Sequence, residues 1–187
     1  GFRGDYFIVT CHPVTRGDES TEQTGKEIFR ALDEFPDYNL VITYPNSDVG
    51  GRALISMMLN YKERNSTRVF VAESLGQIGY LSALKHSKCV VGNSSSGIIE
   101  APSLHVPTID VGSRQEGRIA AASGKHVEPI SSDIKRAIGE ITSNAHQLQD
   151  SDFDNPYDNG YAAKNVLDML KASNLACLNK AFYDVAF

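Results

Sequence analysis

The feature that most constrains this chain is a repeated alternation between short, wholly apolar segments and amphipathic segments. Tyr6 to Thr10 is a short run of aromatic and β-branched residues. Ile28, Leu32 and Phe35 then recur at helical spacing. Wholly apolar strands are typical of parallel sheets whose two faces are both covered by helices. The sequence therefore predicts a Rossmann-like α/β domain with a parallel sheet flanked by helices.

The strand and helix signals run along the whole chain, without an internal repeat, linker or low-complexity segment. We therefore expect one domain over residues 1–187. The expected strands are residues 6–10, 40–43, 68–72, 89–91, 108–111 and 127–130. The expected helices are residues 20–35, 54–59, 78–86, 97–104, 133–141 and 161–170, with Ser131 or Ser132 capping the fifth and a weaker helical pattern from Asn174 onward.

Charge and cysteine content argue against several classes of function. The net charge is -5 without a run of Lys or Arg, which is unlike a nucleic-acid groove. No apolar stretch reaches the roughly 18 residues of a membrane-spanning helix. Cys11, Cys89 and Cys177 are odd in number and far apart, which favours a reducing cytoplasm and gives no metal-ligand spacing. The chain starts with Gly1 rather than Met, so we expect its start to be removed or processed.

The turn after the fourth expected strand is the first candidate binding site. Gly92 to Gly97 reads GNSSSG and opens a helix, so N–H groups and hydroxyls, those of Ser94 and Ser95 among them, would meet a phosphate there. Its spacing matches neither a Walker loop nor a dinucleotide fingerprint. Glu100, on the same helix, could accept two ribose hydroxyls. The alternatives are that the serines only cap the helix and that Glu100 is a solvated first-turn carboxylate.

Polar residues also follow other expected strands. His12 follows the first strand and could donate to a diphosphate or take part in acid–base steps. Asn46 follows the second strand, and Arg114 and Arg118 follow the fifth, where guanidinium groups suit a diphosphate. Singly, each has a simpler explanation as a structural histidine, a turn asparagine or a solvated arginine. Because the carboxyl ends of parallel strands meet at one edge, their convergence favours a phosphorylated ligand.

Together, these segments resemble one enzyme family, the hydrolysing UDP-N-acetylglucosamine 2-epimerases, including those of sialic and legionaminic acid pathways. The resemblance covers about residues 6–170, and residues 180–184 are also like the end of such chains. Its motifs are Thr10-Cys11-His12-Pro13-Val14-Thr15, Tyr44-Pro45-Asn46, Gly92 to Glu100 (GNSSSGIIE), Gly112 to Arg118 (GSRQEGR), and Asn155-Pro156-Tyr157 with Gly160. The last motif departs from the family's usual Asn-Pro-Tyr-Gly-Asp-Gly.

The resemblance implies the carboxy-terminal half of the two-domain GT-B architecture, with a UDP-sugar bound between the domains. It implies that Ser94 and Ser95 hold the diphosphate at a helix N-terminus. Glu100 would bind the ribose hydroxyls. Arg114 would contribute to diphosphate or nucleotide binding.

The other residues of the implied site surround that diphosphate. His12 would be a catalytic or leaving-group-stabilising residue, and Asn46 would lie in the substrate cleft. Arg118 would also bind the UDP-sugar, and the segment 72–79 would lie near the uracil. The resemblance calls for no metal and no nicotinamide or other cofactor.

The implied reaction eliminates UDP to give a glycal-type intermediate, to which water adds. The free 2-epimer, N-acetylmannosamine or a related N-acetylated sugar, is then released. The stretch from Arg114 to Arg118 is like the hydrolysing branch of the family. The amino-terminal domain, whose carboxylates would move the C2 proton, is not part of this sequence, so we expect the chain alone to be inactive.

Two alternatives stay open at this stage. The chain could be the donor-nucleotide-binding half of a GT-B glycosyltransferase, or a non-catalytic nucleotide-sugar sensor or structural domain of this fold. The sequence also leaves open whether the sugar is UDP-N-acetylglucosamine or a diacetamido relative, and whether the whole protein is a homodimer. The expected partners are UDP, UDP-N-acetylated sugars and the amino-terminal domain. We expect no nucleic-acid partner and no membrane partner.

Overall fold

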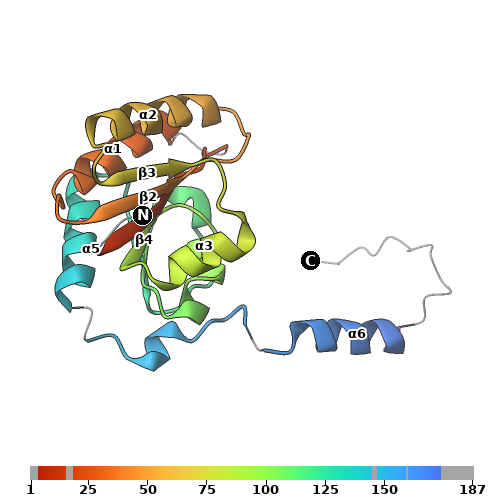
Figure 1. The fold of residues 1–187 in the computed structure, drawn as a ribbon. Helices are drawn as coiled ribbons and strands as arrows, with labels where there is room; N and C mark the ends of the chain where they lie inside the picture. Colours follow the sequence, from red (N-terminus) through yellow and green to blue (C-terminus); the bar gives the residue numbers. More distant parts are fainter. Residues whose placement is uncertain (1–3, 16–18, 145–146, 159, 174–187) are drawn as a thin grey trace, which may run out of the picture. The chain divides into compact units, whose positions relative to one another are not determined.

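The computed structural model describes residues 4–15, 19–144, 147–158 and 160–173. They belong to two units, residues 1–157 and 158–187, and each unit is described by itself. The first unit is built on a six-stranded, all-parallel sheet with the order β3-β2-β1-β4-β5-β6 (Figure 1). The strands are β1 (Tyr6–Thr10), β2 (Asn39–Thr43), β3 (Val69–Ala72), β4 (Cys89–Gly92), β5 (Thr108–Val111) and β6 (Gly124–Val127).

Helices cover both faces of this sheet, as the sequence predicts. The helices of the first unit are α1 (Thr21–Leu32), α2 (Gly51–Arg64), α3 (Gly76–Lys85), α4 (Ser96–Ile99) and α5 (Ser131–Asn144). The short 3₁₀ turns among its described residues are η1 (Pro102–Leu104), η2 (Ser113–Gln115) and η4 (Asp150–Phe153). The fold class is therefore confirmed as a Rossmann-like α/β domain.

Alternate residues along the strands enter two separate cores. Phe7 and Val9 of β1 pack in the larger core with residues of α1, α2 and α5, and all three helices lie on that face. Ile8 of β1 and Val41 of β2 pack in the smaller core, on the face that α3 covers (Figure 1). This period of two follows from the pleat of a strand, and it explains why the strands are apolar on both sides.

The strand order reverses between β1 and β4, which are neighbours although they are distant in sequence. Thr10 at the end of β1 lies beside Gly92 at the end of β4. At such a switch point the connections leave toward opposite sides of the sheet, and a crevice opens at the carboxyl ends of the strands. The fold therefore places the segments after β1 and β4 side by side.

The last strand and the fourth helix differ from the sequence-based prediction. The sixth strand was expected at residues 127–130, but β6 is Gly124–Val127, paired with β5. Pro129 has no N–H to extend the ladder, and Ile130 is 51% exposed. The helix expected at 97–104 is wrong in length: α4 ends at Ile99, and Pro102 begins the separate turn η1.

The second unit contains α6 (Ala162–Ala172), close to the helix expected at 161–170. Val166, Leu167 and Leu170 of α6 recur at helical spacing and are exposed. The helical pattern expected from Asn174 onward lies outside the described residues. None of the helices within the described ranges combines the length and the apolar content needed to cross a bilayer.

Helix α2 offers a test of how the larger core is held together. Leu54 is fully buried, and Gly25 of α1 makes room for it, because a Cβ at Gly25 would lie 2.8 Å from Leu54 Cδ2. Leu54→Ala should lower the free energy of unfolding by about 2–5 kcal/mol, since it leaves a cavity in a packed core. Leu59 of the same helix is 39% exposed, and Leu59→Ala should cost less than about 1 kcal/mol. Urea denaturation measures both, and equal losses would contradict this account of the core.

Candidate functional site

The turn after β4 passes unusually close to the end of β1. Gly92 has φ 139°, and a Cβ at this position would lie 2.0 Å from the carbonyl oxygen of Thr10. No residue with a side chain fits that space, so glycine is required. The close approach brings Asn93, whose N–H donates to the Thr10 carbonyl, directly against the segment after β1.

Asn93 is fully buried and joins three segments of the site. Its side chain forms two hydrogen bonds with the backbone of His12: the His12 N–H donates to Asn93 Oδ1 at 2.7 Å, and Asn93 Nδ2 donates to the His12 carbonyl at 2.9 Å. Its own carbonyl accepts from Arg114 Nη1 at 2.9 Å and from Gln115 Nε2 at 2.8 Å. The segments after β1, β4 and β5 therefore meet at one side chain and its peptide group.

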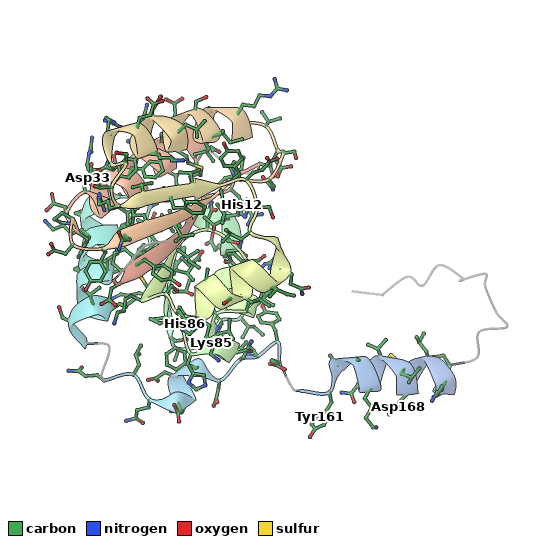
Figure 2. All side chains as sticks on the ribbon, viewed as in Figure 1. His12, Asp33, Lys85, His86, Tyr161 and Asp168 are labelled. Atoms are coloured by element: carbon green, nitrogen blue, oxygen red, sulfur yellow. The ribbon has the colours of Figure 1, made fainter. Side chains whose placement is uncertain are left out.

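His12 is held as a neutral imidazole with a defined tautomer. Its Nδ1 accepts a hydrogen bond from the backbone N–H of Asn46 at 3.0 Å, so the proton of the neutral ring is on Nε2. Burial, and then the positive charge of Arg114, lower the pKa of His12 to about 4, against the opposite influence of Asp48. Figure 2 shows His12 at the end of the sheet to which the strand arrows point. At neutral pH its Nε2–H is therefore a hydrogen-bond donor at the carboxyl ends of the strands.

The three serines of the turn have different tasks. Ser94 Oγ accepts from the N–H of Ser96 at 3.3 Å, and Ser96 Oγ accepts from the hydroxyl of Tyr80 at 2.7 Å. Ser95 is the residue before α4, and its side chain makes no capping bond. The sequence alone could not decide between helix capping and ligand binding for these serines. In the structure, Ser94 Oγ bonds within the turn, whereas the Ser95 hydroxyl does not cap the helix.

One pocket brings together four of the residues that the sequence singled out. It has a volume of about 360 Å³, and its wall contains His12, Ser94, Ser95 and Glu100 together with the residues 73–76 that follow β3. Glu100 Oε2 is buried and has no hydrogen-bond partner. A buried carboxylate oxygen without a donor is costly, so it calls for a donor from outside the chain.

Two further predicted residues, Asn46 and Arg114, line other hollows and do not line this pocket. Asn46 lines a cavity of about 730 Å³ after β2 and β3, and Asn46 Nδ2 donates to Asp48 at 2.7 Å. Arg114 lines a cavity of about 460 Å³ with the residues 13–15 that follow His12. Because the Asn46 N–H and the Arg114 guanidinium both reach the His12–Asn93 pair, these hollows surround the same group of side chains.

Arg118 is the predicted site residue that the structure does not bring to this group. It is exposed and lines a separate cavity of about 260 Å³ with Gly97, Asp110 and His126. The 3₁₀ turn η2 explains the difference. Arg114 and Gln115, within that turn, donate to Asn93, whereas Arg118 comes after the turn ends.

Sequence reasoning missed three residues that shape the site. Asn93 and Gln115 lie inside two of the sequence motifs, but ligand binding was predicted only for the hydroxyl and guanidinium groups beside them. Glu19 was missed completely: its carboxylate accepts from the N–H and the hydroxyl of Ser113, both at 2.8 Å. It thereby fixes the start of the segment that carries Arg114. No local signal links residues 94 positions apart, so only the fold could reveal that contact.

The described residues contain no group of three or more His, Cys, Asp or Glu side chains that could hold a metal ion. Cys11 and Cys89 are buried and free, and burial raises the pKa of the Cys11 thiol to about 12, so it is not a nucleophile. Among the other histidines, His86, His105 and His126 are exposed, and His146 lies outside the described residues.

Comparison with known proteins gives a consistent result. Residues 2–171 match the protein family described as UDP-N-acetylglucosamine 2-epimerase. A relative from Campylobacter jejuni, named GDP/UDP-N,N'-diacetylbacillosamine 2-epimerase (hydrolyzing), is 35% identical over 115 residues, which are 62% of this chain and 30% of that protein. Polysialic acid biosynthesis protein P7 of Escherichia coli is 30% identical over 185 residues, which are 96% of this chain and 46% of that protein.

The fold comparison agrees. The solved structure described as the S. aureus MnaA–UDP co-structure has a TM-score of 0.68 and 23% sequence identity, covering 89% of this chain and 45% of that one. This likeness concerns the fold. The chain spans less than half the length of these relatives.

The hydrogen bond to His12 Nδ1 and the nearby charges can be tested by NMR of the unliganded chain. We expect the ¹⁵N shifts of His12 to report an Nε2-protonated neutral ring with a pKa near 4. Arg114→Gln should raise the pKa of His12, because it removes a nearby positive charge. Asp48→Asn should lower that pKa further, because it removes a nearby negative charge. An Nδ1-protonated ring, or shifts of the same sign in both variants, would contradict the geometry.

Proposed function

Since this chain belongs to the UDP-N-acetylglucosamine 2-epimerase family, we propose that it is the nucleotide-sugar-binding half of a hydrolysing member. The single observation that carries the proposal is the pocket shared by His12, Ser94, Ser95 and Glu100. Its wall combines hydrogen-bond donors with an unpartnered carboxylate oxygen, that of Glu100. A nucleoside diphosphate has the complementary pattern, with phosphate acceptors joined to ribose donors.

The diphosphate would lie at the turn between β4 and α4. Ser95 would donate its hydroxyl, and Ser94 would contribute at the same turn. Arg114 uses one of its N–H groups on Asn93 and keeps the others for the phosphates. Helix α4 is only four residues long, so its dipole adds little, and we assign the binding to specific donors.

His12 would donate its Nε2–H to the diphosphate from the other side. When the bond between the sugar and UDP breaks, negative charge develops on the leaving phosphate oxygen. Arg114 and His12 would stabilise this charge by hydrogen bonding, and donors fixed in advance do so without reorganising. This role needs no imidazolium, which agrees with the lowered pKa of His12.

The nucleoside would extend from the diphosphate toward α3. Glu100 would accept the two ribose hydroxyls, which supply the donors that its buried oxygen lacks. The uracil would meet the segment 73–76 after β3, which lines the same pocket. Asn46 would face the sugar side, where its Oδ1 is buried without a partner. Because Arg118 borders a separate cavity, we give it no direct part in UDP binding.

For the complete protein we propose a second, amino-terminal domain that closes the cleft and supplies the carboxylates that move the C2 proton. The whole enzyme would convert UDP-N-acetylglucosamine, or a diacetamido relative, to UDP and the free 2-epimer. The names support both sugars, since the matching family is described as UDP-N-acetylglucosamine 2-epimerase and one relative is named for diacetylbacillosamine. The cytoplasm is the compartment we propose, in keeping with the free thiols of Cys11 and Cys89.

Product identification tests this function. The complete protein should release UDP and a free 2-epimerised sugar from UDP-N-acetylglucosamine or from UDP-N,N'-diacetylbacillosamine, as detected by NMR in deuterated water with deuterium entering at C2. The 187-residue chain alone should bind UDP without turnover. A product with a new glycosidic bond would instead favour a glycosyltransferase, and the absence of UDP binding by the chain would contradict the proposal.

The ribose contact predicts a selective loss on mutation of Glu100. Glu100→Gln should weaken UDP binding about tenfold to a hundredfold, because a hydrogen bond to a charged group contributes about 1.5–3 kcal/mol. It should change the affinity for 2′,3′-dideoxy-UDP much less, because that ligand has no ribose hydroxyls to donate. Calorimetry measures all four affinities.

The matched control is Glu63→Gln, an exposed glutamate on α2, which should leave both affinities unchanged. If Glu100→Gln weakens UDP and the dideoxy ligand equally, Glu100 does not contact the ribose.

A further inference from the structure

We propose that Asn93 is a positioning residue that couples His12, the serine turn and Arg114 into a single diphosphate-binding unit. This inference rests on the proposed function, since it assumes that a diphosphate binds there. Asn93 itself would not need to touch the ligand: it is fully buried, and its polar groups are bonded to the protein. Its effect would come through the groups that it holds.

The side chain of Asn93 hydrogen-bonds to His12 in the way that the backbone of a neighbouring strand would. The side-chain amide pairs with both the N–H and the carbonyl of His12, one accepting and one donating. This extends the pairing of β1 and β4 by one residue beyond Thr10 and Gly92, where the backbone itself turns away. A carboxylate in place of the amide lacks the donor, and a shorter side chain does not span both bonds, so asparagine fits this position by its chemistry.

The backbone carbonyl of Asn93 links the same residue to the segment after β5. Two side chains of η2, Arg114 and Gln115, converge on this one oxygen. Gln115 is itself 4% exposed, so its bond is well shielded from water and sets the position of the turn. Arg114 is then held by a neutral carbonyl rather than by a carboxylate, and its positive charge stays available to a phosphate.

The nucleoside end of the pocket has no bond to Asn93. Glu100 lies at the end of α4 and the segment 73–76 follows β3, whereas the side chain of Asn93 bonds to His12 and its carbonyl to Arg114 and Gln115. Loss of the Asn93 side chain should therefore loosen the diphosphate end and leave the nucleoside end intact. A residue that only stabilises the fold would affect both ends alike.

Asn93→Ser tests this difference, because serine is neutral and small and introduces no charge near the phosphates. We expect the Kd of the chain for UDP, from calorimetry, to rise tenfold or more, about 1.4 kcal/mol or more. The Kd for uridine, from ligand-observed NMR, should stay within about twofold of the wild-type value. Asn65→Ser is the matched control: Asn65 Nδ2 also donates to a backbone carbonyl, that of Tyr61, at the far edge of the sheet, so both affinities should be unchanged.

A measurement on the wild-type chain covers the case in which Asn93→Ser does not fold. Adding UDP should shift the Asn93 side-chain amide together with the His12 ring and the Arg114 guanidinium signals, although Asn93 is buried. Uridine should leave all three in place. An Asn93 signal that UDP leaves unmoved while His12 and Arg114 shift would overturn the coupling.

The outcomes separate the two proposals. If the wild-type chain binds UDP more tightly than uridine and Asn93→Ser keeps that ratio, the positioning role is wrong and the proposed function stands. If the variant weakens both ligands equally, Asn93 has only a structural role. If the wild-type chain does not bind UDP at all, the proposed function itself fails.

Discussion

The site depends on the close approach of two backbones at the switch point of the sheet. A Cβ at Gly92 would lie 2.0 Å from the Thr10 carbonyl, so any other residue would push β1 and β4 apart. With glycine there, the next residue enters the gap between the two segments and pairs with His12. A parallel sheet forms a crevice where its strand order reverses. In this chain, Asn93 fixes the donors of His12 and Arg114 at that crevice.

Electrostatics at this crevice differ from those of the chain as a whole. The net charge is -5, yet the ligand proposed for the site is an anion. The local arrangement resolves this, because Arg114 donates to the neutral Asn93 carbonyl rather than to a carboxylate. Burial, and then the positive charge of Arg114, lower the pKa of His12, so the ring is neutral at neutral pH. The site therefore offers one full positive charge and several neutral donors, an arrangement that suits an anion without needing a basic surface.

The sequence predicted the sheet and the residues near the pocket, but not the contacts that hold them. Strands and helices were predictable because apolar periodicity is a local property, and the errors came at prolines: Pro102 interrupts the fourth helix, and Pro129 prevents the sixth strand from lying at 127–130. The grouping of His12 with Ser94 followed from the rule for parallel sheets. The contact of Glu19 with Ser113 joins residues far apart in sequence, and no local pattern encodes it. The position of Arg118 was unpredictable for the same reason: η2 places Arg114 against Asn93, whereas Arg118 follows the turn and lines a separate cavity.

The buried side-chain oxygens that lack a hydrogen-bond partner indicate more about the ligand than the hydrogen-bond donors of the site do. Among the described residues, the buried side-chain oxygens without a partner are Asn46 Oδ1, Glu100 Oε2, Asp110 Oδ1 and Gln115 Oε1. All four are acceptors, and Asn46 and Glu100 border the hollows around His12. The bridging phosphate of a diphosphate only accepts hydrogen bonds at neutral pH, so the diphosphate group would satisfy the donors of the turn and leave these oxygens unpaired. A ligand that meets both sets must join phosphates to hydroxyl or amide donors, and a nucleoside diphosphate carrying a sugar has both.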